Sequence, residues 1–305
     1  MASMTDAPTE PTILVTGAAG QVGFELLRSL QGLGRIVAAD RRTLDLSDFD
    51  QLTRVIREVN PRLIINAAAY TAVDQAESDA DAAQRANGEA PGVLAEQACR
   101  IGAALIHYST DYVFDGGKDD FYHEGDSPHP LNTYGRTKLQ GERAIEQVGG
   151  KHLVFRTSWV YGARGRNFLR TMMRLARERS ELSVVSDQIG APTWSVTIAA
   201  LTAQIATQVL IDHFDDEDWW SRCAGVYHLT AGGYTSWAGF AQAIFESLDA
   251  TARPTVKPIS TQEYPTPAQR PRNSRLATAK LTSVFSVRPP NWREALALCM
   301  ASLQQ

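Results

Sequence analysis

Two side chains near the middle of the chain have a spacing suited to acid–base chemistry. Tyr134 and Lys138 are four residues apart, so a helix would place both on one face. An ammonium group beside a phenol favours the phenolate, which brings the tyrosine pKa down from about 10 toward neutral pH. A tyrosine tuned in this way can protonate a ketone oxygen while a hydride reduces its carbon. The alternative is that the two residues are merely neighbours on the exposed face of a helix. Other features of the sequence must distinguish between these interpretations.

Three glycines near the N-terminus have the spacing of a dinucleotide-binding turn. Gly17, Gly20 and Gly23 follow the apolar run 12–16 and precede a helical pattern. Gly17 allows a sharp turn, Gly20 lets the backbone approach a pyrophosphate, and Gly23 allows close packing of the helix on the strand. The free N–H groups and the positive dipole end of the helix would stabilise the phosphates.

An acid at the end of the second expected strand would contact the adenosine. Asp40 follows Gly17 by 23 residues, where a carboxylate can accept hydrogen bonds from ribose hydroxyls. Arg41 and Arg42 come next, and guanidinium groups there could neutralise the additional phosphate of NADP. The sequence therefore predicts a nicotinamide dinucleotide, NADPH or NADH, and leaves the choice between them open. Five further residues could contact the adenine, and ordinary packing is the alternative for each of them. They are Asp45, Leu46, Ala67, Ala68 and Ala69.

Two polar residues come directly after the fourth expected strand. Thr110 and Asp111 would lie at the carboxyl edge of the sheet, where doubly wound folds bind their ligands. Thr110 can donate a hydrogen bond to a substrate carbonyl, and Asp111 can hold a sugar hydroxyl. The alternative for Asp111 is a loop or helix-capping acid.

Alternating strands and helices must position these groups. Short apolar runs without polar alternation are typical of parallel strands that are buried on both faces. Helical patterns between them supply right-handed crossovers, so the sequence predicts an α/β fold with a doubly wound parallel sheet of Rossmann type. The expected strands are residues 12–16, 35–39, 62–66, 104–108, 152–156 and 226–229, and the expected helices are residues 22–30, 49–59, 82–101 with a break at Pro91, 134–148, 196–210 and 236–248.

The length of 305 residues indicates about two domains. We expect residues 1–157 to form a dinucleotide-binding domain. Residues 158–305 would form mainly a smaller, discontinuous α/β substrate-binding domain. An apolar run at 182–185 reads as another strand of the sheet, and with the helix at 196–210 it indicates that the chain returns to the first domain at about 180–215.

Composition and charge exclude several classes of protein. Thirty Lys and Arg against 34 Asp and Glu give a net charge of -4, which argues against a nucleic-acid binder. No apolar stretch approaches the roughly 20 residues of a membrane span, and Met1–Pro11 is polar, unlike a signal peptide. We therefore expect a cytoplasmic protein without a membrane partner. The three cysteines lack metal-ligand spacing, and the acidic run 212–218 matches no calcium loop, so we expect no metal site.

Seven segments in chain order together resemble the dTDP-4-dehydrorhamnose reductase family of extended short-chain dehydrogenase/reductases. The resemblance runs from about Thr12 to Trp292, and the later segments are far more specific than the Tyr-x-x-x-Lys pair. The segments are residues 17–23, 66–77, 109–116, 134–138, 156–162, 187–193 and 270–276.

The resemblance implies a role for each matching residue. Tyr134 would be the proton donor, Lys138 its partner and a ligand of the nicotinamide ribose, and Thr110 the third catalytic group. Substrate contacts would come from Thr110, Asp111 and Trp159. Cofactor contacts would come from Gly20, Gln21, Val22, Asp40, Asp45, Leu46, Ala69, Tyr70 and Thr71, with Tyr70 replacing a histidine often found in the family.

A basic segment near the C-terminus offers groups for a diphosphate. Three arginines lie within residues 270–275, and their forked guanidinium groups suit the diphosphate of a nucleotide-sugar. We expect Arg270 and Asn273 to contact the substrate, and a solvated basic loop is the alternative.

Assembly through a metal is not expected. Some members of the family dimerise through magnesium held by glutamates, and Glu25 stands at the first such position. Val196 and Ser302 stand where further ligands would be expected, and valine cannot bind a hard cation. We expect a monomer or a weak homodimer without a magnesium bridge.

The resemblance and the residues together predict an enzyme. Its reaction would be reduction of the C4 ketone of dTDP-4-dehydro-6-deoxy-L-mannose to dTDP-L-rhamnose, with hydride from NADPH or NADH. One alternative is a regulatory subunit of a methionine adenosyltransferase-like partner, because retained motifs do not guarantee turnover. Another is a different nucleotide-sugar reductase, an epimerase or a dehydratase; a dehydratase would need a second carboxylate where Tyr112 stands.

Overall fold

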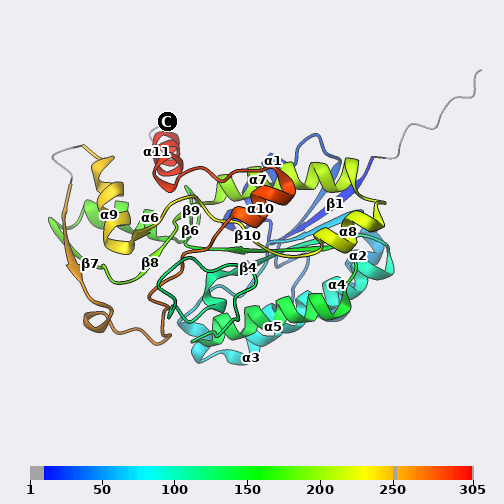
Figure 1. The fold of residues 1–305 in the computed structure, drawn as a ribbon, viewed down its shortest axis with the longest axis horizontal. Coiled ribbons are helices and arrows are strands. Elements are labelled where there is room, and N and C mark those ends of the chain that lie inside the picture. The colour runs from blue at the N-terminus through cyan, green and yellow to red at the C-terminus, as the bar shows by residue number, and fades with distance from the viewer. Residues whose placement is uncertain (1–9, 250–252, 304–305) are drawn as a thin grey trace, which may run out of the picture.

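A computed structural model describes residues 10–249 and 253–303 of the chain. Most of the polar N-terminal segment considered above lies outside these residues. The molecule is elongated, with a large central sheet in one part and smaller strand pairs in the other (Figure 1).

A parallel sheet forms the larger part, as the sequence predicted, and it has six strands. Its order is β10-β5-β4-β3-β1-β2, so β1 lies between β2 and β3 and the chain winds outward in both directions from it. Every residue of β3, β4 and β5 is buried, which explains their continuous apolar runs. The strands are β1 (Thr12–Thr16), β2 (Arg35–Ala39), β3 (Leu63–Asn66), β4 (Ala104–Thr110), β5 (His152–Thr157) and β10 (Gly225–His228).

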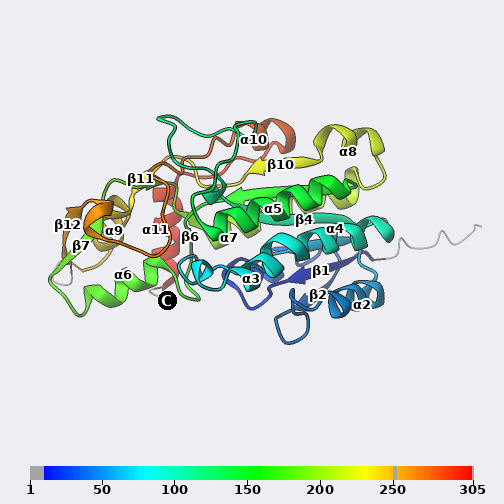
Figure 2. The ribbon, with the colours of Figure 1, turned by 90° about the horizontal axis from the view of Figure 1, so that it is seen from below.

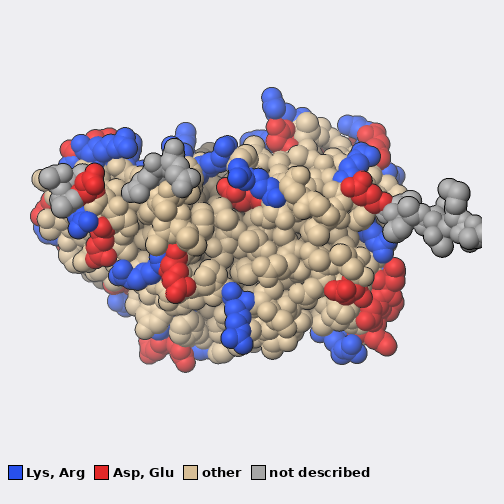
Figure 3. Space-filling model, turned by 90° about the horizontal axis from the view of Figure 1, so that it is seen from above, with Lys and Arg blue, Asp and Glu red and all other residues tan. Residues whose placement is uncertain are grey.

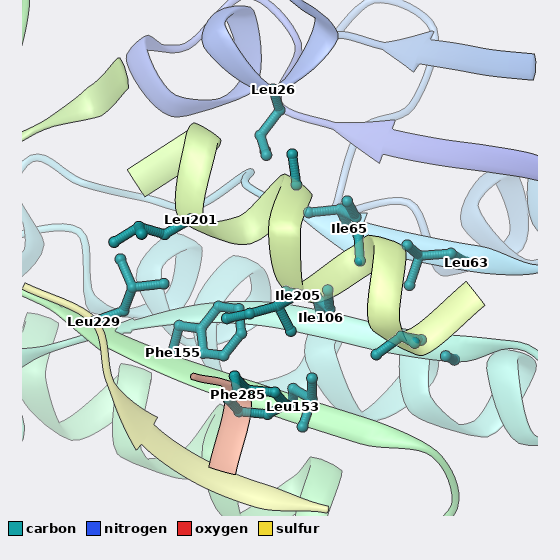
Figure 4. Packing of buried hydrophobic residues seen from close by; sticks show 14 of the residues in the cluster. Leu26, Leu63, Ile65, Ile106, Leu153, Phe155, Leu201, Ile205, Leu229 and Phe285 are labelled. Atoms are coloured by element: carbon teal, nitrogen blue, oxygen red, sulfur yellow. The ribbon is translucent and has the colours of Figure 1, made fainter. Parts of the chain in front are cut away.

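Helices cover both faces of this sheet (Figures 1 and 2). Successive side chains of a strand point to opposite faces, so Ile13 and Val15 join one core while Leu14 joins the other. Figure 4 shows the first core, in which Leu26, Leu201 and Ile205 pack on the sheet. The helices on that face are α1 (Gln21–Ser29), α7 (Ser195–Thr207), α8 (Glu217–Cys223) and α10 (Ala279–Phe285), and those on the other are α2 (Phe49–Val59), α3 (Ala80–Ala83), α4 (Ala90–Arg100) and α5 (Thr133–Val148).

The expected helix at residues 82–101 is interrupted. A π-helix, η2 (Gln84–Glu89), separates α3 from α4, and Pro91 lies in the first turn of α4. Proline has no N–H to donate and its ring crowds the carbonyl four residues earlier, so the α-helical ladder cannot run through it. The break predicted at Pro91 therefore takes the form of a π turn just before it.

A second core holds the smaller part together. Its members include Leu182 of β7, Phe240 of α9 and Trp292 of α11. The elements of the smaller part are α6 (Phe168–Ala176), β7 (Glu181–Val185), α9 (Trp237–Glu246), β12 (Thr255–Ile259) and α11 (Trp292–Leu303), with the short strands β6 (Val160–Tyr161), β8 (Ile189–Gly190), β9 (Thr193–Trp194) and β11 (Thr235–Ser236).

The strand expected at residues 182–185 forms but does not join the six-stranded sheet. As β7 it pairs in parallel with β12. Leu182 and Val184 are buried while Ser183 is exposed, and this alternation is typical of a strand with one solvent-facing side. The chain rejoins the larger part through α7, which packs against α1, and β10, which pairs with β5.

One segment comes closer to a membrane span than the sequence analysis allowed. Ser195–Asp212, which is α7 and the π-helix η4 (Gln208–Asp212), has a mean hydropathy of 1.3 over 18 residues. The fold accounts for this composition, because 56% of the segment is buried inside the protein. The acidic run that follows is used structurally, since Asp216 caps α8 and Asp215 pairs with Arg62.

Charges of both signs are mixed on one face of the molecule. On the face shown in Figure 3, basic side chains alternate with acidic ones around the rim, and uncharged residues fill the centre. Such a distribution differs from the basic stripe of a nucleic-acid-binding surface.

Candidate active site

A cavity of about 930 Å³ opens at the carboxyl ends of β1, β3 and β4. This is the switch point of the sheet, where ligands of doubly wound folds bind. The expected residues that line it are Gly17, Gly20, Gln21, Val22, Asp40, Arg41, Asp45, Leu46, Ala67, Ala68, Ala69, Tyr70, Thr71, Thr110, Asp111, Tyr134, Lys138 and Trp159. Gly23, Arg270 and Asn273 are not part of its lining.

The glycine turn fits the phosphates of a dinucleotide. Gly17 has a φ of 66°, and a Cβ there would lie 2.7 Å from the carbonyl carbon of Ala67, so only glycine fits. Gly20 is the N-cap of α1 and brings no side-chain cap to its free N–H groups. A Cβ on Gly23 would overlap the Gly17 carbonyl oxygen, which explains why that glycine is needed although it lies behind the cavity wall.

Two paired acids line the end of the cavity where the sequence analysis expected the adenosine. Asp40 accepts hydrogen bonds from the backbone N–H of Arg42 at 3.0 Å and from its guanidinium at 3.1 and 3.2 Å. Asp45 accepts from Ser47 and lies 3.6 Å from the guanidinium of Arg41. The arginines that could neutralise an additional phosphate therefore already neutralise these carboxylates.

Tyr70, which stands where the family often has histidine, is held in place by its neighbours. Its backbone N–H donates to Asn87 Oδ1 at 2.8 Å, and its hydroxyl donates to Asp79 Oδ2 at 3.0 Å. Its phenol oxygen is thus already paired, and the neighbouring wall is made of Ala67–Ala69.

Tyr134 and Thr110 face the cavity from two elements. Tyr134 lies in the first turn of α5, whose N-cap Asn132 accepts from the backbone of Gly135. Removal from solvent raises the pKa of Tyr134 to about 12, and a hydrogen bond between Tyr134 and Thr110 opposes the shift. From the sequence we expected the Lys138 ammonium to bring this pKa down toward neutral pH. Burial, the largest effect on Tyr134, raises it instead.

Asp111 is a buried acid beside these two groups. It is 2% exposed, and Thr110 Oγ1 donates to its Oδ1 at 3.0 Å. Its second oxygen has no hydrogen-bond partner among the described residues. Burial raises the pKa of Asp111 to about 7. The second oxygen is itself buried, and hydrogen bonds with Ser274 and Thr110 oppose the rise in pKa.

Lys138 is held from behind by a buried polar chain. Its Nζ donates to the Tyr108 carbonyl and lies 3.1 Å from His107 Nε2. The chain continues through Asn66 to the hydroxyl of Thr16 at the end of β1. Burial lowers the pKa of Lys138 to about 8, against the opposing charge of Glu142. Sequence analysis missed His107, although a histidine within an apolar strand was a signal that could have found it.

Trp159 stacks on a tryptophan that sequence analysis also missed. Its ring lies 3.5 Å from that of Trp237, with 4° between the planes, and both line the cavity. Gly190 leaves room for the Trp159 ring, because a Cβ there would lie 2.5 Å from it. Trp237 Nε1 donates to Gln188 Oε1 at 3.1 Å, which fixes the pair. Trp237 is the first residue of α9, and nothing in the sequence around it indicated a binding site.

Arg270 and Asn273, expected to contact the substrate, are engaged elsewhere. The Arg270 guanidinium makes two hydrogen bonds to Asp74, at 2.7 and 3.0 Å. Asn273 Nδ2 donates to the carbonyls of Lys118 and Asp120. Both side chains thus hold loops together, and the expected guanidinium fork for a diphosphate is occupied by a carboxylate within the chain.

Comparison with known proteins agrees with this geometry. The family model described as RmlD substrate binding domain matches residues 11–305. The dTDP-4-dehydrorhamnose reductase of Burkholderia thailandensis is 49% identical over 95% of this chain and 98% of its own length, and that of Escherichia coli K12 is 44% identical over 92% and 94%. The crystal structure of a dTDP-4-dehydrorhamnose reductase from Bacillus anthracis in complex with NADP has a TM-score of 0.88 at 34% identity, covering 96% of this chain and 100% of that one. The resemblance inferred from the sequence is therefore confirmed, and the chain belongs to the dTDP-4-dehydrorhamnose reductase family.

Proposed function

We propose that this protein reduces the C4 ketone of dTDP-4-dehydro-6-deoxy-L-mannose to dTDP-L-rhamnose with NADPH or NADH, the last step of dTDP-L-rhamnose biosynthesis. The observation that carries the proposal is that one cavity joins Tyr134, Thr110 and Lys138 to a glycine turn suited to a dinucleotide. When bound, the nicotinamide supplies the hydride.

Each side chain then has a role that its position supports. Thr110 and Tyr134 hydrogen-bond the ketone oxygen, which stabilises the charge that develops there. Tyr134 delivers the proton, and the ammonium of Lys138 stabilises the resulting phenolate and holds the nicotinamide ribose. Asp111 accepts a sugar hydroxyl, and Trp159 with Trp237 forms the apolar wall against the sugar.

The cofactor's adenosine half takes the other end of the cavity. Gly17, Gly20, Gln21 and Val22 surround the pyrophosphate at the start of α1. The remaining contacts are Asp40, Arg41, Asp45, Leu46, Ala67, Ala68, Ala69, Tyr70 and Thr71. Gly23 acts through the packing of the turn.

The two parts of the molecule, each with its own hydrophobic core, have different proposed functions. We assign dinucleotide binding to the part built on the six-stranded sheet and substrate binding mainly to the smaller part. We also propose a cytoplasmic monomer or weak homodimer without a magnesium bridge. Within residues 10–249 and 253–303, no group of three or more His, Cys, Asp or Glu side chains is placed to hold a metal.

Turnover tests the proposal directly. Purified protein should consume NADPH or NADH when given enzymatically prepared dTDP-4-dehydro-6-deoxy-L-mannose. Tyr134→Phe should lower kcat by about 100-fold or more, since general acid catalysis contributes 10²–10⁴-fold, while its affinity for the cofactor stays near that of the wild type. Tyr112→Phe, which removes the hydroxyl from the ring packed edge-on against Tyr134, is the matched control. Full activity in Tyr134→Phe would contradict the proposed mechanism.

A further inference from the structure

A segment from the smaller part of the molecule lies on the glycine turn. Asn167 Nδ2 donates to Gln21 Oε1 at 2.7 Å and to the carbonyls of Gly162 and Arg164, each at 2.9 Å. A Cβ on Gly165 would lie 3.0 Å from the Gln21 side chain. Residues 162–167 are therefore fastened directly to the first residue of α1.

One arginine of this segment faces the cavity. Arg166 lines it together with Gly20 and Gln21, and its side chain is exposed. Throughout the part of the chain that the structure describes, no carboxylate forms an ion pair with Arg166. Its neighbours are used differently: Arg164 lies 3.7 Å over the Phe24 ring, and Arg170 donates to the Ala163 carbonyl.

The glycine turn itself supplies no positive side chain. Gln21–Phe24, the first turn of α1, contains neither Lys nor Arg. A pyrophosphate carries two negative charges, and a guanidinium fork pairs with phosphate oxygens by two parallel hydrogen bonds. We propose that Arg166 binds the pyrophosphate of the nicotinamide dinucleotide, completing the site formed by the N–H groups at the start of α1.

Binding measurements test this assignment, and they do not depend on the sugar that the enzyme reduces. Dissociation constants of NADPH, NADH and ADP-ribose would be measured by calorimetry for the wild type and for Arg166→Gln. Because the three ligands share only the ADP-ribose portion with its pyrophosphate, all three should bind roughly five- to ten-fold more weakly, as expected for an exposed charge-assisted hydrogen bond. Adenosine, which lacks the pyrophosphate, should bind equally to both proteins.

Two further variants separate a specific contact from general charge. Arg164→Gln removes the same charge from the same segment, outside the cavity, and should leave the three dissociation constants within about two-fold, because exposed charges interact weakly at physiological salt. Arg166→Lys should recover part of the affinity. Circular dichroism and thermal unfolding would establish that each variant is folded.

Other outcomes would overturn the assignment. A loss confined to NADPH would place Arg166 on the additional phosphate of NADP. A raised KM for the nucleotide-sugar with unchanged cofactor affinity would place it on the substrate diphosphate. Equal losses in Arg164→Gln, or no loss in Arg166→Gln, would show that Arg166 makes no specific contact with the pyrophosphate.

Discussion

Lys138 Nζ lies 3.1 Å from Nε2 of His107, and both side chains are buried. The other ring nitrogen of His107 lies 2.9 Å from Asn66 Nδ2. The backbone N–H of Ala68 donates to Asn66 Oδ1, which turns the amide nitrogen of Asn66 toward the ring. His107 therefore carries its proton on Nε2, pointing at Lys138. The ammonium form of Lys138, whose pKa burial lowers, then faces another donor, whereas a neutral amine could accept the hydrogen bond from Nε2.

His107→Gln should raise the pKa of Lys138, because an amide oxygen can accept from the ammonium. The other groups that face Lys138 are the Tyr108 carbonyl and Glu142, which is paired with Arg156. If the ammonium is the active form, kcat falls as the pH rises through the pKa of Lys138, about 8 in the wild type.

In His107→Gln, the alkaline limb of the kcat–pH profile, where kcat falls, should therefore move to higher pH by roughly one unit. A profile of kcat from about pH 6 to 10 checks this. An unchanged limb, or one moved to lower pH, would show that His107 only fills space.

Asp111→Asn should stabilise the fold at alkaline pH. Burial raises the pKa of Asp111 from 3.8 to about 7, so between these values the folded protein binds more protons than the unfolded chain. The contribution of Asp111 to the free energy of unfolding therefore falls as the pH rises through this window and stays unfavourable above it. Asparagine removes that cost, which is on the order of 2–4 kcal/mol at pH 8.

Urea unfolding of both proteins at pH 5 and pH 8 isolates this contribution. The advantage of the variant should be larger at pH 8 than at pH 5. The same advantage at both pH values would mean that Asp111 does not titrate in this range.

Arg42→Ala should change the preference between the two cofactors. Arg42 neutralises Asp40, and without it a free carboxylate would face the position of the additional phosphate of NADP. We expect NADPH to bind about ten-fold more weakly relative to NADH. Dissociation constants for both cofactors measure the ratio, and Arg28→Ala, an exposed arginine on α1, is the control. A ratio equal to that of the wild type would show that Asp40 stays neutralised by Arg41.

The local parts of the site could be predicted from sequence, whereas those made by distant partners could not. The strand 12–16 and its glycine turn are contiguous, so their spacing already carried the geometry. The pairing of Arg270 could not be foreseen, because its partner, Asp74, is 196 residues away. The strand at 182–185 was recognised, but periodicity says nothing about which sheet a strand joins. Trp237 reaches the cavity only through the packing of α9.

Breaking the buried ion pair under the site should destabilise the central part. Arg156 and Glu142 are 4% and 5% exposed, and two guanidinium nitrogens donate to the carboxylate at 2.6 and 2.9 Å. Breaking such a pair leaves an uncompensated charge in the interior, which costs about 3–5 kcal/mol. We therefore expect Glu142→Gln to lower the free energy of unfolding by a few kcal/mol. The exposed pair of Glu178 and Arg174 offers the control, because Glu178→Gln should cost less than about 1 kcal/mol. If urea unfolding gave equal losses for the two variants, the Arg156 charge would have to be compensated by another group.

Glu142→Gln should also change the pH dependence of kcat. Without the Glu142 charge the pKa of Lys138 should fall, so the alkaline limb of the kcat–pH profile should move to lower pH, opposite to the shift expected for His107→Gln.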